Sequence, residues 1–342
     1  MPDHNAKYLD ILQIFRGIAA VMVVIHHTVP AFVYYQNIKL PLLSFIAQLG
    51  KHGIDFFFLL SGFIISYSVQ TKDKTFNEFK KYMLNRIIRI YVPYLPIGIL
   101  LYFLYSTFSM SNVNRDIDLI TSFTLFPNGI PALSVAWTLS YEMMFYILFG
   151  LSFISIRFWN IFSVIWLLTI ILFNYVFSFN FSHIIFFNKY NIDFLLGYLL
   201  YLFYVKKINI SPKWTISLII LFSLMLLFLK YNHINLFSIS SNLISSILFF
   251  FLIYFYITYY NNKKNADFLL KLGSASYSIY LIHNPLMSIL VRIMPKMNLF
   301  TYLIEILITI VVCCFCGYLY HLIFEKYLTQ KIKHFIIKHN IS

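Results

Sequence analysis

The amino-acid sequence predicts an all-α integral membrane protein, a bundle of about ten transmembrane helices. Of the 342 residues, 60% are hydrophobic and 11% are charged, and the mean hydropathy is +0.77. A soluble domain carries ~25% charged residues, so this chain has too few ions to cover a surface in water. Apolar runs of the length that an α-helix needs to cross a hydrocarbon core of ~30 Å recur along the sequence.

Ten segments have this length and composition, and we expect each to cross the membrane. In chain order they are 9–30, 53–71, 88–109, 135–156, 159–178, 191–205, 214–230, 242–260, 274–294 and 301–324. The sixth is the shortest. Arg16, His26 and His27 interrupt the first apolar run, so we expect it to stay in the protein rather than serve as a cleaved signal peptide.

The distribution of basic residues predicts the orientation. With the N-terminus in the cytoplasm, 18 of the 26 Lys and Arg residues fall on the cytoplasmic side and 7 outside, and Arg16 lies within the first span. Basic residues concentrate in cytoplasmic loops of membrane proteins, so we expect both termini in the cytoplasm. The same rule explains the net charge of +14, and no soluble basic domain is present to bind nucleic acid.

Outside the spans the chain offers little room for another catalytic module. We expect a single domain over residues 1–342 with no appended soluble domain, so that the helices and their loops perform any chemistry. The longest connection, 110–134, contains Pro127, Asn128, Gly129 and Pro131, and it is either a lid or re-entrant loop or a plain connector. The cysteines of 313–316 lack the spacing of a metal site, and we expect no metal and interpret them as packing residues.

An ionisable side chain within a membrane span costs at least ~2.5 kcal/mol, so each one needs a reason. Arg16 and His27 are eleven residues apart, which at ~100° and ~1.5 Å per residue places them on one helix face about 16 Å apart. His26 falls off that face. Alternatively, Arg16 extends toward the headgroups and His27 is held by a helix neighbour. We favour the aligned pair as a functional site.

Acidic residues at span ends have two interpretations. Asp55 opens the second span, where it would pair with a protonated His27 or simply complement the helix dipole. Ser61 and Gly62 in the same span are typical of close helix packing. For Asp193 and Glu305, also near helix ends, we expect exposure at the membrane interface.

Further polar residues mark the third, fourth and ninth spans. Arg86 and Arg89 share a helix face and suit a phosphorylated cofactor, although they also fit a cytoplasmic flank. Glu142 is the only acid of its span and shares a face with Tyr146, so it is a candidate general base, an orienting group for a histidine, or a hydrogen-bonding residue inside the bundle. His283, before Pro285, is either functional or structural.

These polar positions fall in sequence blocks that together resemble acyltransferase family 3. The blocks are Leu12–Ala20, His27, Gly53–Phe63, Arg86–Tyr91, Trp137–Glu142 with Phe145 and Tyr146, and Gly273–Tyr280 with His283. Their order and spacing extend over essentially the whole chain. The closest similarity is to the exopolysaccharide and O-antigen acetyltransferases, on the basis of Leu12-Gln13 and Tyr141-Glu142.

The resemblance implies a bacterial inner-membrane enzyme of ten helices that transfers an acyl group, commonly acetyl from acetyl-CoA, to a surface carbohydrate or lipid-linked sugar. It implies cofactor contacts at Arg16, Arg86 and Arg89, although Asn85 stands where relatives often carry another Arg. We therefore expect catalysis by His27 and Glu142. The residues expected to bind substrate are Asp55, Trp137, Tyr141 and His283.

Two other functional classes also fit a polar site inside a helical bundle. A transporter or flippase for a lipid-linked sugar or an acyl donor would need the same span count and intramembrane ions. A scaffold of a polysaccharide export complex is a third possibility, and it would not bind acetyl-CoA. The resemblance favours the enzyme.

Overall fold

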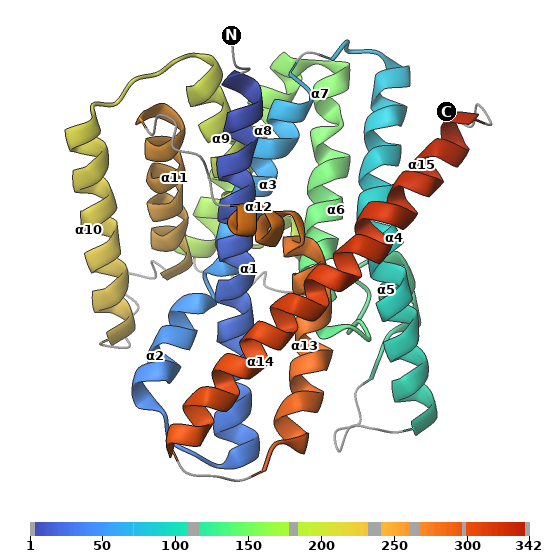
Figure 1. Ribbon diagram of the computed structural model, residues 1–342. Helices are drawn as coiled ribbons and strands as arrows, with labels where there is room; N and C mark the ends of the chain where they lie inside the picture. The colour runs from blue at the N-terminus through green and yellow to red at the C-terminus, as the bar shows by residue number, and fades with distance from the viewer. Residues whose placement is uncertain are drawn as a thin grey trace. The chain divides into compact units, whose positions relative to one another are not determined.

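The computed structural model describes residues 4–70, 72–108, 116–177, 184–231, 241–259, 267–295 and 299–338. The described residues form helices joined by loops (Figure 1). They also contain one isolated parallel β-bridge, between Ile117 and Ile130. The chain forms two compact units, each assembled from segments that are far apart in sequence. Helix α1 (His4–Gln36) contributes to the first unit as far as His26 and to the second from His27 onward.

The first unit comprises Met1–His26, Lys39–Lys72 and Trp159–Ser274. Besides α1 it contains the helices α2 (Pro41–Gly50), α3 (Gly53–Ser68), α8 (Ile156–Ile171), α9 (Asn191–Val205), α10 (Pro212–Tyr231), α11 (Ser241–Tyr259) and α12 (Asp267–Ser274). A π-helical turn, η2 (Leu172–Val176), ends α8, and a short 3-10 helix, η3 (Ile185–Phe187), precedes α9. Helices α10 and α11 run side by side (Figure 1).

Two glycines bring α3 and α9 into backbone contact. A Cβ on Gly62 would lie 2.2 Å from the carbonyl oxygen of Phe194, and one on Gly197 would lie 2.1 Å from that of Leu59. Small residues allow helices in a membrane to approach this closely, so the close-packing interpretation of Gly62 is confirmed. This contact fixes the height of Asp55 on α3 relative to Asp193 on α9.

The second unit comprises His27–Ile38, Asp73–Phe158 and Ala275–Ser342. It contains α4 (Phe76–Phe108), α5 (Leu119–Thr124), the 3-10 helix η1 (Ser134–Ala136), α6 (Trp137–Phe149), α7 (Leu151–Ile154), α13 (Ser276–Ile293), α14 (Leu299–Tyr320), the π-helix η5 (His321–Leu328) and α15 (Thr329–Lys338). Helices α13 and α14 lie against each other (Figure 1). Gly317 permits this contact, because a Cβ there would lie 2.5 Å from Cγ1 of Ile279.

Each of the ten predicted spans corresponds to a helix, and eight helical segments in the described residues are long and apolar enough to cross a membrane. The other two are α9, which has 15 residues, and α13, which carries His283, Asn284 and Pro285 at its centre. Eight candidate spans show a multi-pass membrane protein. Ten crossings and the cytoplasmic termini remain predictions.

The segment 110–134 was predicted to be either a lid or re-entrant loop or a plain connector. Residues 110–115 lie outside the described residues, and the part that follows them packs against α4. Asp118 caps α5 by accepting from the backbone N–H of Thr121, and it also accepts from Asn128. The hydroxyl of Tyr94 donates to the carbonyl of Ser122 at 2.6 Å. The hydrogen bonds from Thr121 and Asn128 lower the pKa of the Asp118 carboxyl.

Candidate active site

The central polar feature of the second unit is a pair of histidines on α1 and α13. Nδ1 of His27 lies 3.1 Å from Nε2 of His283, and the two ring centroids are 5.0 Å apart. His283 is fully buried, and His27 is partly exposed. The structure thus brings together the predicted catalytic histidine and a residue predicted to bind substrate.

The hydrogen bonds of this pair define the protonation of both rings. Nδ1 of His283 lies 2.7 Å from the carbonyl oxygen of Tyr280, which can only accept, so Nδ1 carries the proton. In a neutral imidazole the other nitrogen is then an acceptor, so Nε2 of His283 accepts a hydrogen bond from Nδ1–H of His27. The lone pair of His27 is therefore on Nε2, the nitrogen that can act as a base.

The start of α6 packs against α13 one turn from the pair. The Thr138 hydroxyl lies 2.9 Å from that of Tyr280, whose ring is 5.7 Å from the His283 ring. Nδ2 of Asn284 donates to the Ser134 hydroxyl at 2.6 Å. These contacts fix the rotation of α13, and with it the direction in which His283 faces.

A cavity of about 50 Å³ lies beside these contacts, and Ser134, Asn284 and Ser288 contribute its polar lining. This volume suits one small polar group, such as a water molecule or a hydroxyl.

Of the other residues predicted to bind substrate, Trp137 and Tyr141 stack edge to face with ring centroids 5.6 Å apart on α6. Tyr141 is buried, and Trp137 is partly exposed.

Arg86 and Arg89 lie on α4 among aromatic and acidic side chains of the same unit. The buried guanidinium of Arg86 stands over the rings of Tyr82 and Tyr146, at 5.5 and 5.3 Å from their centroids. The Tyr146 hydroxyl donates to Oε1 of Glu142 at 2.5 Å. Glu142 also attracts the charge of Arg89. Glu142 therefore belongs to an arginine cluster in this unit.

A second carboxylate acts on Arg89 and was not predicted from the sequence. Glu325 lies on the π-helix η5, where its Oε2 accepts from the Ser278 hydroxyl at 2.8 Å and lies 2.9 Å from Nδ1 of His321. π-Helical turns often occur at functional sites. The sequence signal was available, because an acid and a histidine four residues apart stand at the end of an otherwise apolar helix.

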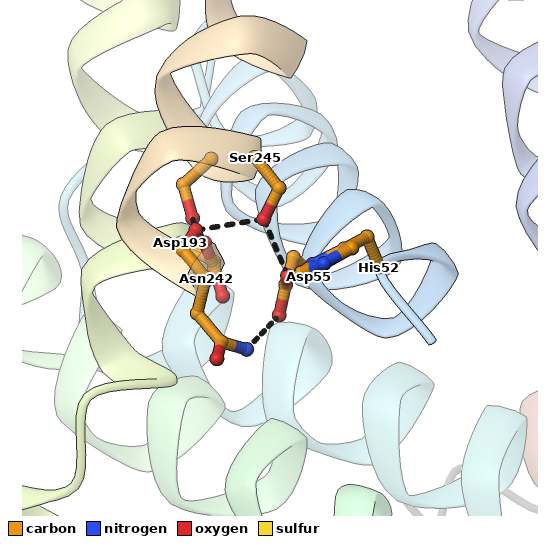
Figure 2. Close-up of polar contacts among 6 residues, drawn as sticks. His52, Asp55, Asp193, Asn242 and Ser245 are labelled. Atoms are coloured by element: carbon orange, nitrogen blue, oxygen red, sulfur yellow. Dashed lines mark hydrogen bonds and ion pairs between the residues drawn. The ribbon is translucent and has the colours of Figure 1, made fainter. Parts of the chain in front are cut away.

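The first unit contains the remaining predicted residues, Arg16 and Asp55. Arg16 is partly exposed on α1. The carboxylate of Asp55 is buried and accepts from Asn242 at 3.0 Å on Oδ1, and from Ser245 at 2.7 Å on Oδ2 (Figure 2). His52, which was not predicted from the sequence, places Nδ1 2.7 Å from Oδ2 of Asp55. The expected partner of Asp55 was a protonated His27, whereas the partners that the structure gives are these three residues.

The prediction that Asp193 and Glu305 are exposed is wrong, because their side chains are 1% and 8% exposed. Asp193 accepts a hydrogen bond from Ser246 on α11. Both acids lie near helix ends, but the neighbouring helices cover them. In the described residues, no group of three or more His, Cys, Asp or Glu side chains forms a possible metal site.

A family model described as an acyltransferase domain, that of acyltransferase family 3, matches residues 8–337. The match extends over segments of both units, including both histidines of the pair and the arginines of α4. No curated protein and no solved structure matches the chain. The chain therefore belongs to acyltransferase family 3, as a multi-pass membrane acyltransferase.

Proposed function

We propose that this protein transfers an acetyl group from acetyl-CoA to a hydroxyl of a surface polysaccharide or lipid-linked sugar, in the cytoplasmic membrane of a bacterium. The observation that carries the proposal is the hydrogen bond between His27 and His283, 3.1 Å long, inside a chain of an acyltransferase family. The exopolysaccharide-like and O-antigen-like sequence blocks support a carbohydrate acceptor.

In this proposal His27 is the general base and His283 positions it. Nε2 of His27 removes the proton of the acceptor hydroxyl while the oxygen attacks the thioester carbonyl. The carbon–sulfur bond then breaks, the ester forms, and the imidazolium returns the proton to the CoA thiolate. Throughout, Nδ1 of His27 donates to Nε2 of His283, which holds the ring in the reactive tautomer.

We propose that the donor phosphates bind Arg86 and Arg89 of the second unit, and the donor contact expected for Arg16, in the first unit, stays a prediction. Guanidinium groups form paired hydrogen bonds to phosphate oxygens, and Arg86 is held in place by the two tyrosine rings below it. Glu142 is assigned to this cluster as the carboxylate that keeps the arginines and Tyr146 in place between turnovers. We propose Trp137, Tyr141 and Asp55 as contacts of the acceptor side.

The test is a transfer assay with purified full-length protein in lipid nanodiscs. Acetyl-CoA and an acceptor glycan are supplied, and free CoA and the O-acetylated product are both quantified. The parent should produce the two in equal amounts, and a variant with His27→Ala should produce neither above background. The matched control is His26→Ala. His26 is the adjacent histidine, and its Nδ1 lies 2.9 Å from the carbonyl oxygen of Ala47 rather than beside His283.

The outcome that would overturn the proposal is product formation by the His27→Ala variant at the parental rate. In sealed proteoliposomes, accumulation of acceptor inside the vesicles without release of CoA would indicate the transporter, which family membership does not favour. Varying both substrates together separates direct transfer from an acyl-histidine route, since the latter gives ping-pong kinetics.

A further inference from the structure

The polar network around Asp55 in the first unit is complete except at one atom. The two carboxylate oxygens of Asp55 accept from Asn242, Ser245 and His52, and Asp193 accepts from Ser246. These donors come from α11 and from the residue that precedes α3 (Figure 2). Among the described residues, Nε2 of His52 has no hydrogen-bond partner, although the side chain is 1% exposed.

Such an atom is costly unless something binds it. Leaving a buried polar group unpaired costs about 1–3 kcal/mol, and the rest of this network shows that the helices can supply partners. Because Nδ1 of His52 faces a carboxylate, it carries a proton, and Nε2 presents a lone pair. A carboxylate that fixes the tautomer of a histidine in this way leaves the other nitrogen available to a hydroxyl donor.

The charges around His52 indicate what else the ligand carries. Lys51 precedes His52 in the junction between α2 and α3 and is exposed, so the buried ring is one residue from a surface ammonium group. Lys51 repels the ammonium groups of Lys189 and Lys230, and Lys189 and Lys230 repel each other. Burial, followed by the repulsion from Lys51, lowers the pKa of Lys189. Three ammonium groups therefore lie close enough to repel one another, and the buried carboxylate of Asp55 attracts two of them, Lys189 and Lys230.

A ligand with a negative charge would relieve the repulsion among the three ammonium groups. A ligand with a hydroxyl would donate the hydrogen bond that Nε2 of His52 lacks among the described residues. Phosphorylated sugars and acidic sugars have both groups. The predicted orientation places the three lysines on the external side, which is where a surface glycan is found.

We propose that the first unit binds an anionic sugar, with one sugar hydroxyl donating to Nε2 of His52 and the phosphate or carboxylate lying against Lys51, Lys189 and Lys230. Asp55 positions His52, and Asn242 and Ser245 position Asp55. The inference deepens the proposed function, on which it rests for the role of acceptor, because it names an anionic glycan as the acceptor class.

Equilibrium binding to the purified full-length protein in nanodiscs tests the proposal without any acyl donor. The probes are glucose 1-phosphate, glucuronate, glucose and inorganic phosphate. We expect one of the two probes that carry both groups to bind at least about tenfold more tightly than glucose or phosphate, since each of these lacks one contact. A preference for glucose 1-phosphate indicates a glycosyl phosphate, and a preference for glucuronate indicates an acidic sugar.

Variants locate the binding. His52→Gln and Asp55→Asn should each weaken the preferred probe about tenfold, and Lys189→Gln should weaken it and reduce its salt dependence. The matched control is the exposed Lys39→Gln, which should stay within about twofold of the parent.

The proposal is overturned if all four probes bind equally or not at all, or if His52→Gln binds as the parent does. Where the His52 and Asp55 variants fail to fold, the parent labelled with ¹⁵N-histidine decides, because the probe must shift the His52 ring signal. Transfer to neutral acceptors with no binding of the anionic probes would refute the inference alone. Binding without any release of CoA from acetyl-CoA would refute the proposed function alone.

Discussion

Each unit of this protein holds a histidine in a fixed tautomer, and the two units use different partners to do so. In the first unit the partner is the carboxylate of Asp55, at 2.7 Å from Nδ1 of His52. In the second unit it is the imidazole of His283, at 3.1 Å from Nδ1 of His27. Both partners accept a hydrogen bond from Nδ1–H, which leaves the lone pair of the neutral ring on Nε2.

The difference lies in charge. The carboxylate of Asp55 places a negative charge beside its histidine, whereas a neutral imidazole places none. A base in acyl transfer must take a proton and return it within one cycle, and the neutral partner of His27 allows this. In our proposals, turnover belongs to the second unit and recognition to the first.

The largest effect is expected from His27→Ala. Loss of a general base typically costs 10²–10⁴-fold in rate, so kcat for acetyl transfer should fall by roughly 10³-fold. Steady-state release of CoA, with the Asp55→Asn variant measured in parallel, sharpens the comparison. A larger fall in kcat for Asp55→Asn than for His27→Ala would reverse the roles assigned to the two units.

His283 should have a smaller effect that depends on the replacement. Leu cannot accept from Nδ1 of His27, so His283→Leu should lower kcat about 10–100-fold, the value of a hydrogen bond to a charged group. Gln supplies an amide oxygen for His27 and an N–H for the Tyr280 carbonyl, so His283→Gln should recover much of that loss. Rates over a pH series check the role, and equal losses for Leu and Gln would indicate only a packing role.

Arg86 should affect the donor rather than the chemical step. Its guanidinium lies over two tyrosine rings, an arrangement that the ammonium group of Lys does not reproduce. We expect Arg86→Lys to raise KM for acetyl-CoA about tenfold with little change in kcat, and Arg86→Ala to raise it further. Arg157→Ala, at an exposed cytoplasmic position, is the control. A loss confined to kcat would contradict the assignment.

The helices and the close packing at Gly62 could be predicted from the sequence. The length of an apolar segment and the presence of a small residue within it can both be seen in the local sequence. The ten segments all became helices, and Gly62 is a packing contact. The pairing of His27 with His283 could not be predicted, because a helix that is apolar on all sides does not reveal which face meets which neighbour. That information lies in contacts such as those of Ser134 and Thr138 with α13.

The network of the first unit carried a weaker signal that was overlooked. Asn242, Ser245 and Ser246 follow one another at spacings of three and one along an otherwise apolar span, which places three polar groups on one face. A polar stripe of this kind in a membrane helix indicates buried polar partners on another helix. For Asp193, closeness to a helix end was mistaken for exposure, since the chain position of a residue does not show what packs over it.

The smallest effect is expected on stability, from helix packing. Substituting one glycine in each unit tests it. A methyl group at Gly62 in the first unit meets the Phe194 backbone at 2.2 Å, whereas one at Gly98 in the second unit meets the Tyr94 ring at 3.3 Å. Backbone atoms cannot move aside without separating α3 from α9, so Gly62→Ala should lower stability by about 1–3 kcal/mol. Gly98→Ala should be neutral or slightly stabilising, because Ala favours helix by about 1 kcal/mol over Gly. Thermal unfolding in one detergent checks both, and similar midpoints for the two variants would show that α3 and α9 can move apart without loss.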